Sequence, residues 1–379
     1  MKKNAVLSLF VLASVALMGC SPSAASSTSA SDSGKASTSD AASTSTSTST
    51  DDGKIRVNDG TVVTSTVVNC YMPSPAGLQK KFEADFEAKY PGIDMVITSG
   101  TTGELTAKIK AEKANPVCDV LILASWSDGI AAINDMTNYN ILAYTPKDSD
   151  KLNSAFKEST NKIWGTSASA VGVIYNTDLV QKSTIEALDW ADFGNSAKWN
   201  ASTYSFSIPD PTKSGACKDF LAGFVTAGNG QTVLNSWVSN GITNGGGNKA
   251  ALASVEGGSI AALIAGVDYN AYSDKKKGQS IDIYYPKSGT VVNPRPAMIL
   301  ADGAHNDAAK LVMDYLCSES AQKLVADAYL IPGRSDVAAK SDRLGLNDIT
   351  QFSNMNWNTM AEQGSTIAQN FVDAIKNRG

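Results

Sequence analysis

The sequence predicts an α/β fold in two lobes, and three observations support this prediction. Between residues 61 and 128, short apolar runs typical of buried strands alternate three times with runs whose apolar residues recur at helical spacing. The chain has 379 residues, which is more than one domain of ordinary size needs. Two further strand-like runs, 162–176 and 291–300, are placed so that they lead from one lobe to the other and back.

The N-terminus is predicted to be a targeting segment. Lys2 and Lys3 precede an apolar run that is too short to span a membrane with its own flanks. The run ends in Leu17-Met18-Gly19-Cys20, which resembles the lipobox of bacterial lipoproteins. This resemblance implies that residues 1–19 are a signal peptide cleaved before Cys20, and that Cys20 is lipidated. The alternative is an ordinary secretory signal followed by a cysteine.

Residues 20–54 are predicted to be a disordered tether that begins at Cys20. The segment consists almost wholly of Ser, Thr, Ala, Gly and Asp, so it has too little apolar surface to offset the entropy of ordering. Such a chain reaches roughly 5–6 Å times the square root of its residue number. It would hold a domain near a membrane while leaving it free to turn.

The first lobe is predicted to contain three strands with helices between them. The strands are expected over 61–71, 93–98 and 119–124. The first helix has an apolar face made of Leu78, Phe82, Phe86 and Tyr90. The third strand is almost entirely apolar, as buried parallel strands are.

The turn after the second strand has a pattern typical of a helix start that binds an anion. Thr101 and Glu104 have the spacing of a capping box, which predicts that a helix begins here. The first amides of a helix have no intrahelical acceptor, and the positive end of the helix dipole attracts negative charge. Two interpretations stay open: a ligand site, or a well-capped helix and nothing more. The candidate ligand-binding residues are Ser99, Gly100, Thr101 and Thr102.

A second turn of the same kind follows the strand predicted over 204–208. Ligands of open α/β sheets bind at strand-to-helix turns beyond the carboxyl ends of the strands. Two such turns therefore favour a shared ligand site over two unrelated helix caps. The candidate residues of the second turn are Asp210, Thr212, Ser214, Gly215 and Ala216.

Three more candidates lie at strand ends or in a crossing strand. Ser125 and Trp126 follow the third strand, where the tryptophan either covers a ligand or closes the core. Ser169 lies in the first crossing strand.

The last candidates, Asp268 and Tyr269, follow an apolar strand predicted over 259–267. A carboxylate directly after a buried strand needs a partner, so Asp268 is either a ligand contact or a helix cap. A glycine run at 244–248 superficially resembles a phosphate loop but lacks the flanking pattern of one. A single helix is predicted over 308–329.

Composition argues against several classes of function. The net charge of −5 and the absence of a basic stripe disfavour nucleic acid as a partner. The one histidine, His305, lies in a turn that leads into a helix and is interpreted as a surface residue. No cysteines have metal-ligand spacing, and Cys70, Cys118, Cys217 and Cys317 are interpreted as small buried residues. We therefore predict no catalytic residue, no metal and no cofactor.

Several motifs together resemble a known family. In order, the chain carries the lipobox, the Ser/Thr tether, SGTTGELTAKI, NPxxDVL, DPTKSG, YYPKSGTVV and AAKLVMDYLCSESAQKL. This order is similar to that of extracellular solute-binding proteins of bacterial ABC importers, in the ferric-iron, phosphonate and sugar-phosphate branch. The resemblance implies a type II periplasmic-binding-protein-like fold, with two open, mostly parallel sheets flanked by helices and joined by two crossing strands. It implies one lobe from 55–168 plus 290–379 and another from 169–289.

The resemblance also implies the function. A monomer held on the extracytoplasmic face of the membrane by lipid on Cys20 would capture a small anionic solute and deliver it to an ABC permease. Helix starts hold phosphorus oxygens in organophosphate-binding members, so we predict a phosphonate such as 2-aminoethylphosphonate, or a phosphate ester. Asp268 would then hold a positive or hydroxylated end of the solute.

Three alternatives stay open. Ferric iron or thiamine is the alternative ligand, although iron binders have a tyrosine pair where this chain has Tyr269-Asn270. A tethered sensor domain could use the same fold. An exported hydrolase would need an activated nucleophile or a metal cluster, which the sequence does not offer.

Overall fold

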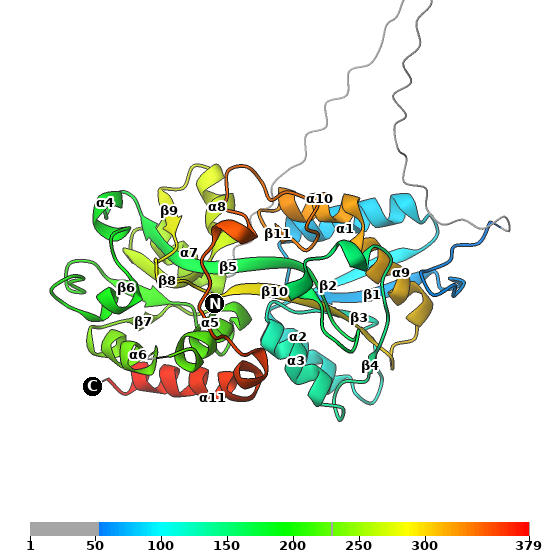
Figure 1. The fold of residues 1–379 in the computed structure, drawn as a ribbon, viewed down its shortest axis with the longest axis horizontal. Helices are drawn as coiled ribbons and strands as arrows, with labels where there is room; N and C mark the ends of the chain where they lie inside the picture. The colour runs from blue at the N-terminus through cyan, green and yellow to red at the C-terminus, as the bar shows by residue number, and fades with distance from the viewer. Residues whose placement is uncertain (1–52, 229, 379) are drawn as a thin grey trace, which may run out of the picture. The chain divides into compact units, whose positions relative to one another are not determined.

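The computed structural model describes residues 53–228 and 230–378. These residues form a mixed α/β fold in which one continuous sheet runs through two lobes in the strand order β2-β1-β3-β10-β5-β8-β6-β7 (Figure 1). We call the part around β1, β2 and β3 the first lobe and the part around β6, β8 and β9 the second lobe.

The first lobe begins with three parallel strands, and β1 lies between β2 and β3. Its elements are β1 (Val67–Met72), α1 (Ala76–Lys89), β2 (Asp94–Ser99), α2 (Thr102–Ala111), β3 (Val120–Ile122), α3 (Trp126–Asn134) and β4 (Ile141–Leu142). The predicted face of α1 is confirmed, because Leu78, Phe82 and Phe86 are buried. The capping box of α2 is also confirmed, since Thr101 and Glu104 exchange both hydrogen bonds.

Two long strands connect the lobes, as predicted. These are β5 (Trp164–Asn176) and β10 (Val292–Leu300), which run antiparallel and side by side (Figure 1). β5 pairs with β10 as far as Ala170 and with strands of the second lobe from Val171. The ladder between β5 and β10 shifts register between Arg295 and Pro296, where proline has no N–H to donate.

The second lobe continues the sheet from β5 through β8 to β6 and β7. Its elements are α4 (Lys182–Ile185), β6 (Phe206–Ile208), α5 (Gly215–Thr226), α6 (Gly230–Ser239), β7 (Thr243–Asn244), α7 (Asn248–Glu256), β8 (Ala262–Val267), α8 (Asp268–Lys276) and β9 (Ile281–Tyr284).

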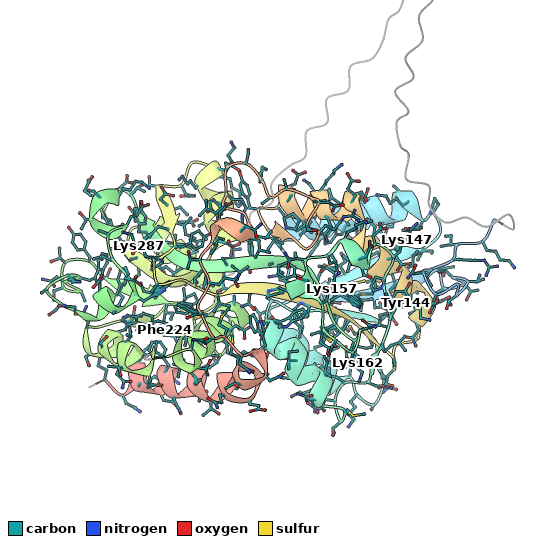
Figure 2. The ribbon with its side chains drawn as sticks, viewed as in Figure 1. Tyr144, Lys147, Lys157, Lys162, Phe224 and Lys287 are labelled. Atoms are coloured by element: carbon teal, nitrogen blue, oxygen red, sulfur yellow. The ribbon has the colours of Figure 1, made fainter. Side chains whose placement is uncertain are left out.

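An aromatic cluster fills the core of the second lobe. Trp190, Phe193 and Trp199, which the sequence predicts as core residues, are all buried. The Trp190 indole N–H donates to the Gly289 carbonyl at 2.7 Å, so its burial leaves no unpaired donor. Phe224, labelled in Figure 2, stacks on Trp237 with ring centroids 5.7 Å apart.

The chain ends with α9 (Asn306–Cys317), α10 (Glu319–Asp327), β11 (Ile331–Pro332) and α11 (Trp357–Lys376). The prediction of one helix over 308–329 is wrong, because the chain is extended at Ser318. The Ser318 hydroxyl accepts the Ala321 N–H at 3.4 Å and caps a new helix. α11 packs against α5 of the second lobe and α3 of the first, so it contacts both lobes.

Within the described residues, no helix is long and apolar enough to cross a membrane. The predicted signal peptide, the lipidation site at Cys20 and nearly all of the tether lie outside those residues.

Candidate functional site

A cavity of about 710 Å³ lies between the two lobes. The first lobe lines it with residues 73–75, 100–102 and 124, and the second lobe with 213–216, 247–250, 253, 267, 269 and 270, while Arg295 comes from β10. Its charged lining residues are Lys213, Lys249 and Arg295, and none of the described residues that line it is acidic. The cavity therefore presents positive charge and helix starts from both lobes to whatever occupies it.

The start of α2 forms the first-lobe wall of the cavity. The Thr101 hydroxyl accepts the Glu104 N–H at 3.3 Å, and the Glu104 carboxylate accepts the Thr101 N–H at 2.7 Å. The Thr102 hydroxyl accepts the Ala124 N–H at 3.1 Å, which fixes the helix start to the end of β3. The Thr102 hydroxyl hydrogen and the amides of Thr102 and Gly103 remain available for an anion, whereas the Glu104 amide is taken up by the cap.

The start of α5 forms the opposite wall. The Ser214 hydroxyl accepts the Cys217 N–H at 3.2 Å and caps the helix. Asp210 shapes the preceding turn, because its carboxylate accepts the Thr212 N–H at 3.0 Å and the Thr212 hydroxyl at 2.6 Å. Of the candidates in this turn, Ser214, Gly215 and Ala216 line the cavity, whereas Asp210 and Thr212 do not.

The glycine run at 244–248 also reaches the cavity. It leads from β7 into α7, where Gly247 is the N-cap and Asn248 and Lys249 form the first turn. Sequence reasoning set this run aside because it does not match a phosphate loop. The usable signal was its position, a glycine run directly between a strand and a helix.

Arg295 is a second residue that sequence reasoning missed. It is 1% exposed, and its Nη2 donates to the Pro73 carbonyl at 2.8 Å. Its guanidinium carbon lies 5.9 Å from the centre of the Tyr269 ring. Burial lowers the pKa of Arg295. The usable signal was a single charged residue in the otherwise uncharged run 291–300.

Comparison with known proteins identifies the family. Residues 71–323 match the family model described as bacterial extracellular solute-binding protein. The chain belongs to this family. No curated protein sequence matches it.

Solved structures of periplasmic binding proteins have the same two-lobed fold. The periplasmic binding protein P5PA is 20% identical with a TM-score of 0.71, over 82% of this chain and 99% of that one. AfuA from Actinobacillus pleuropneumoniae, solved with fructose-6-phosphate, is 20% identical with a TM-score of 0.70, over 83% and 99%. Iron-bound HitA from Pseudomonas aeruginosa is 18% identical with a TM-score of 0.69, over 81% and 99%. At these identities the likeness shows the fold, which confirms the predicted type II architecture.

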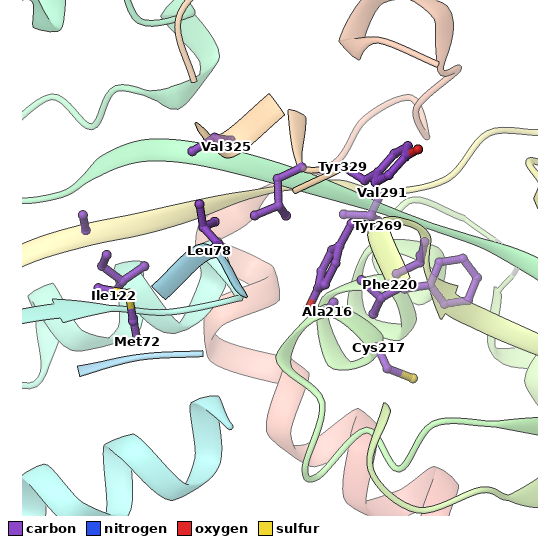
Figure 3. Close-up of a cluster of buried hydrophobic side chains, with 14 of the residues drawn as sticks. Met72, Leu78, Ile122, Ala216, Cys217, Phe220, Tyr269, Val291, Val325 and Tyr329 are labelled. Carbon is purple, nitrogen blue, oxygen red and sulfur yellow. The ribbon is translucent and has the colours of Figure 1, made fainter. Parts of the chain in front are cut away.

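Tyr269 and Asp268 have different environments in this solute-binding protein. Tyr269 lines the cavity, and in Figure 3 its ring extends toward Ala216 at the start of α5. The Asp268 carboxylate is fully buried, 2.7 Å from Arg343 Nη2 and 3.1 Å from the Tyr285 hydroxyl. Burial raises the pKa of Asp268, and Arg343 opposes that shift. Asp268 is not among the residues that line the cavity, and its carboxylate pairs with Arg343.

The remaining candidates do not line the cavity. Trp126 is 4% exposed and packs in the first-lobe core, which favours the core interpretation. Ser99 accepts a hydrogen bond from Gln79 Nε2 at 3.0 Å. Ser169 is buried on β5, opposite Asn293 of β10, and its hydroxyl has no hydrogen-bond partner in the described part of the chain.

Ser125 belongs to a buried polar network between α3 and α5. Its hydroxyl donates to the Asp219 carboxylate at 3.0 Å, and the Ser127 hydroxyl donates to the same carboxylate. Lys218 pairs with Asp128 beside it. Burial raises the pKa of Asp219 to about 6, with Lys218 opposing the shift and Asp128 adding to it.

Asp219→Asn is expected to remove one pH-dependent contribution to stability. The raised pKa means that the folded protein holds this proton more tightly than the unfolded chain, so wild-type stability falls as pH rises from 3.8 to about 6. The uncharged variant lacks this loss and should gain stability relative to wild type across that window. Urea denaturation of both proteins below and above the window measures the difference. An equal difference at both pH values would contradict the expectation.

The cysteines of the described residues lie in the hydrophobic core. Cys70, Cys118, Cys217 and Cys317 are buried and free, and burial raises the pKa of Cys217. No group of three or more His, Cys, Asp or Glu residues is placed to hold a metal ion in the described ranges. His305, which was expected to be a surface residue, is partly buried, with 26% of its side chain exposed. Its Nδ1 lies 3.0 Å from the buried Asp119 carboxylate.

Proposed function

We propose that this solute-binding protein captures a small anionic solute between its lobes and delivers it to an ABC permease. The solute we propose is a phosphonate such as 2-aminoethylphosphonate, or a phosphate ester. One observation carries this proposal: the starts of α2 and α5, from opposite lobes, line one cavity that has no acidic lining residue among those described. The lipobox-like Leu17-Met18-Gly19-Cys20 supports anchoring by lipid on the extracytoplasmic face.

The proposed ligand also explains why the lobes would close. An anion that accepts hydrogen bonds from both helix starts joins the lobes, so its binding energy favours the closed state over an open one. The lobes already lie in contact at these helices, because an added Cβ at Gly103 would lie 3.7 Å from the Thr212 carbonyl oxygen. We propose that the hinge lies in β5, where the strand changes partners between Ala170 and Val171, and that the lobes divide near residues 169 and 290.

Ferric iron is the alternative ligand, and similarity to iron-bound HitA favours it. Iron prefers hard anionic oxygen ligands, and among the described lining residues only the Tyr269 phenol offers one. Thiamine carries positive charge, which the three lining cations disfavour. A thermal-shift panel of phosphonates, sugar phosphates, thiamine and ferric salt tests all of these ligands. A visible charge-transfer band with ferric salt, without stabilisation by phosphonates or phosphates, would contradict our proposal.

The double variant Thr102→Ala, Ser214→Ala is expected to weaken binding of the stabilising phosphonate or phosphate ester. Each lost hydrogen bond to a charged group costs about 1.5–3 kcal/mol of binding free energy. Isothermal titration calorimetry measures the loss. Both substitutions also remove the hydrogen bond that the hydroxyl accepts from a backbone N–H, which lowers stability. A control variant is therefore needed that loses a helix cap elsewhere.

Ser318→Ala is that control, because it removes the N-cap of α10 and does not line the cavity. It should lower the unfolding temperature without changing affinity. If the double variant binds as tightly as wild type, the two helix starts do not hold the ligand.

A further inference from the structure

Arg295 is a buried cation without an ionic partner. It is 1% exposed, and no carboxylate lies within ion-pair distance of its guanidinium in the parts of the chain that the structure describes. Its Nε–H also lacks an acceptor there. The guanidinium bonds to the Pro73 carbonyl through Nη2 and also interacts with the Tyr269 side chain, so its partners are neutral groups. A buried charge without an ion-pair partner destabilises the ligand-free fold, and a bound anion would offset that cost.

The position of Arg295 places this charge at the junction of the lobes. Its strand β10 pairs with β5 at Ser167, and the side chain lines the interlobe cavity. Pro73, which accepts its hydrogen bond, precedes α1 of the first lobe, and Tyr269, whose ring lies against it, belongs to α8 of the second. An anion bound here would contact a cation that both lobes hold in place.

The nearby acid of α8 does not neutralise Arg295. The Asp268 carboxylate lies 2.7 Å from Nη2 of Arg343, and both of these side chains are fully buried. Arg343 is held in place by its bonds to the Leu344 carbonyl, at 2.8 Å, and the Tyr329 carbonyl. Asp268 thus forms its ion pair with Arg343, and it acts on Arg295 only from beyond ion-pair distance.

We propose that Arg295 is the counter-ion of the bound solute and makes the site selective for a doubly negative phosphoryl group over a singly negative one. This inference rests on the proposed function. It adds the charge state of the ligand and the residue that recognises that charge. The helix starts supply partial charges and neutral donors, which suit any oxyanion. A guanidinium adds a full charge and a fork of donors that matches two oxygens of a phosphoryl group.

The test compares ligands that differ only in the charge of the tetrahedral group. Two matched pairs serve: 2-aminoethylphosphonate with 2-aminoethylsulfonate, and glucose 6-phosphate with glucose 6-sulfate. Titration calorimetry at about pH 8 keeps phosphate esters doubly charged, since their second pKa is about 6. Wild type should prefer the phosphorus member of the pair that it binds, by at least about tenfold.

Arg295→Gln should lower affinity for the phosphorus ligand by about 10- to 100-fold and that for the sulfur ligand by less, so that the preference collapses. Arg295→Lys should keep part of the preference, because it keeps the charge and loses the fork. Lys182→Gln is the matched control for general positive charge, because its side chain is 68% exposed and does not line the cavity. We expect a loss below about threefold, since water screens this charge.

Stability of the ligand-free protein gives a second, independent readout. If Arg295 is kept for the ligand, Arg295→Met removes a buried charge that has no ion-pair partner among the described residues, and the ligand-free unfolding temperature should stay equal or rise. A marked fall would show that Arg295 holds the fold together, and would overturn the inference.

The outcomes also separate this inference from the proposed function. If wild type binds a phosphorus ligand and Arg295→Gln binds it equally well, the inference is wrong and the proposed function stands. If wild type binds neither member of any pair nor any other anion, both are wrong.

Discussion

Arg343→Met is expected to destabilise the protein by about 3–5 kcal/mol, the usual cost of removing one partner of a buried ion pair. The variant leaves the Asp268 carboxylate buried without its cation, although Tyr285 and the Tyr269 N–H still donate to it. Urea denaturation at neutral pH measures the loss of unfolding free energy.

The loss should depend on pH in a defined direction. Burial already raises the pKa of Asp268, and removal of Arg343 would raise it further. An aspartate with a raised pKa in the folded state stabilises the fold below its unfolded pKa, and that stabilisation is lost as pH rises toward the folded value. The variant should therefore lie closest to wild type in acid and furthest from it above neutral pH.

The double variant Asp268→Asn, Arg343→Met is the control, because it removes both charges. It should be more stable than Arg343→Met at neutral pH, since no unpaired charge remains. A single variant within about 1 kcal/mol of wild type would show that this pair contributes little, contrary to the argument.

Gly215→Ala is expected to reduce ligand affinity by about 10- to 100-fold, the loss that corresponds to about 1.4–2.8 kcal/mol. A Cβ at Gly215 would lie 2.8 Å from Ser125 Cβ and 3.3 Å from the Thr102 hydroxyl. Ser125 is fully buried and bonded to Asp219, so it cannot move aside without breaking the network between the lobes. The added methyl group should therefore oppose closure. Titration calorimetry gives the affinity, and small-angle scattering with and without ligand reports closure.

Gly103→Ala is the matched control for Gly215→Ala. It also adds a methyl group where the lobes meet, but its Cβ would lie at an ordinary contact distance, 3.7 Å from the Thr212 carbonyl oxygen. Affinity and closure should stay close to wild type. Equal losses of affinity in both variants would mean that any added methyl group where the lobes meet weakens binding. The contact with Ser125 would then not be the cause.

Much of the fold was predictable because it depends on local patterns. The spacing of Leu78, Phe82 and Phe86 placed the buried face of α1, and the capping box of Thr101 and Glu104 placed the start of α2. The break between α9 and α10 was missed, because apolar spacing continues through Ser318 while the backbone does not. Serine favours the N-cap position, so a new helix begins after Ser318 although the apolar periodicity continues.

The candidate site was predictable to the extent that it consists of helix starts. Thr102 and Ser214 were found because the residues that form a cap lie within one turn of each other. Arg295 was missed, and Asp268 was left open between a ligand contact and a helix cap, because the partners of both side chains are distant in sequence. Asp268 and Arg343 are 75 positions apart, and no sequence pattern joins them.

Local patterns in the sequence were enough to predict the strands, the helix starts and the two crossing runs, since spacing and capping act over a few residues. Which charges form ion pairs depends instead on how the chain folds. Folding brings Arg343 onto Asp268 and leaves Arg295 with no carboxylate beside it. The physical reason is that the cost of a buried charge depends on its neighbours in space, and the fold alone sets those neighbours.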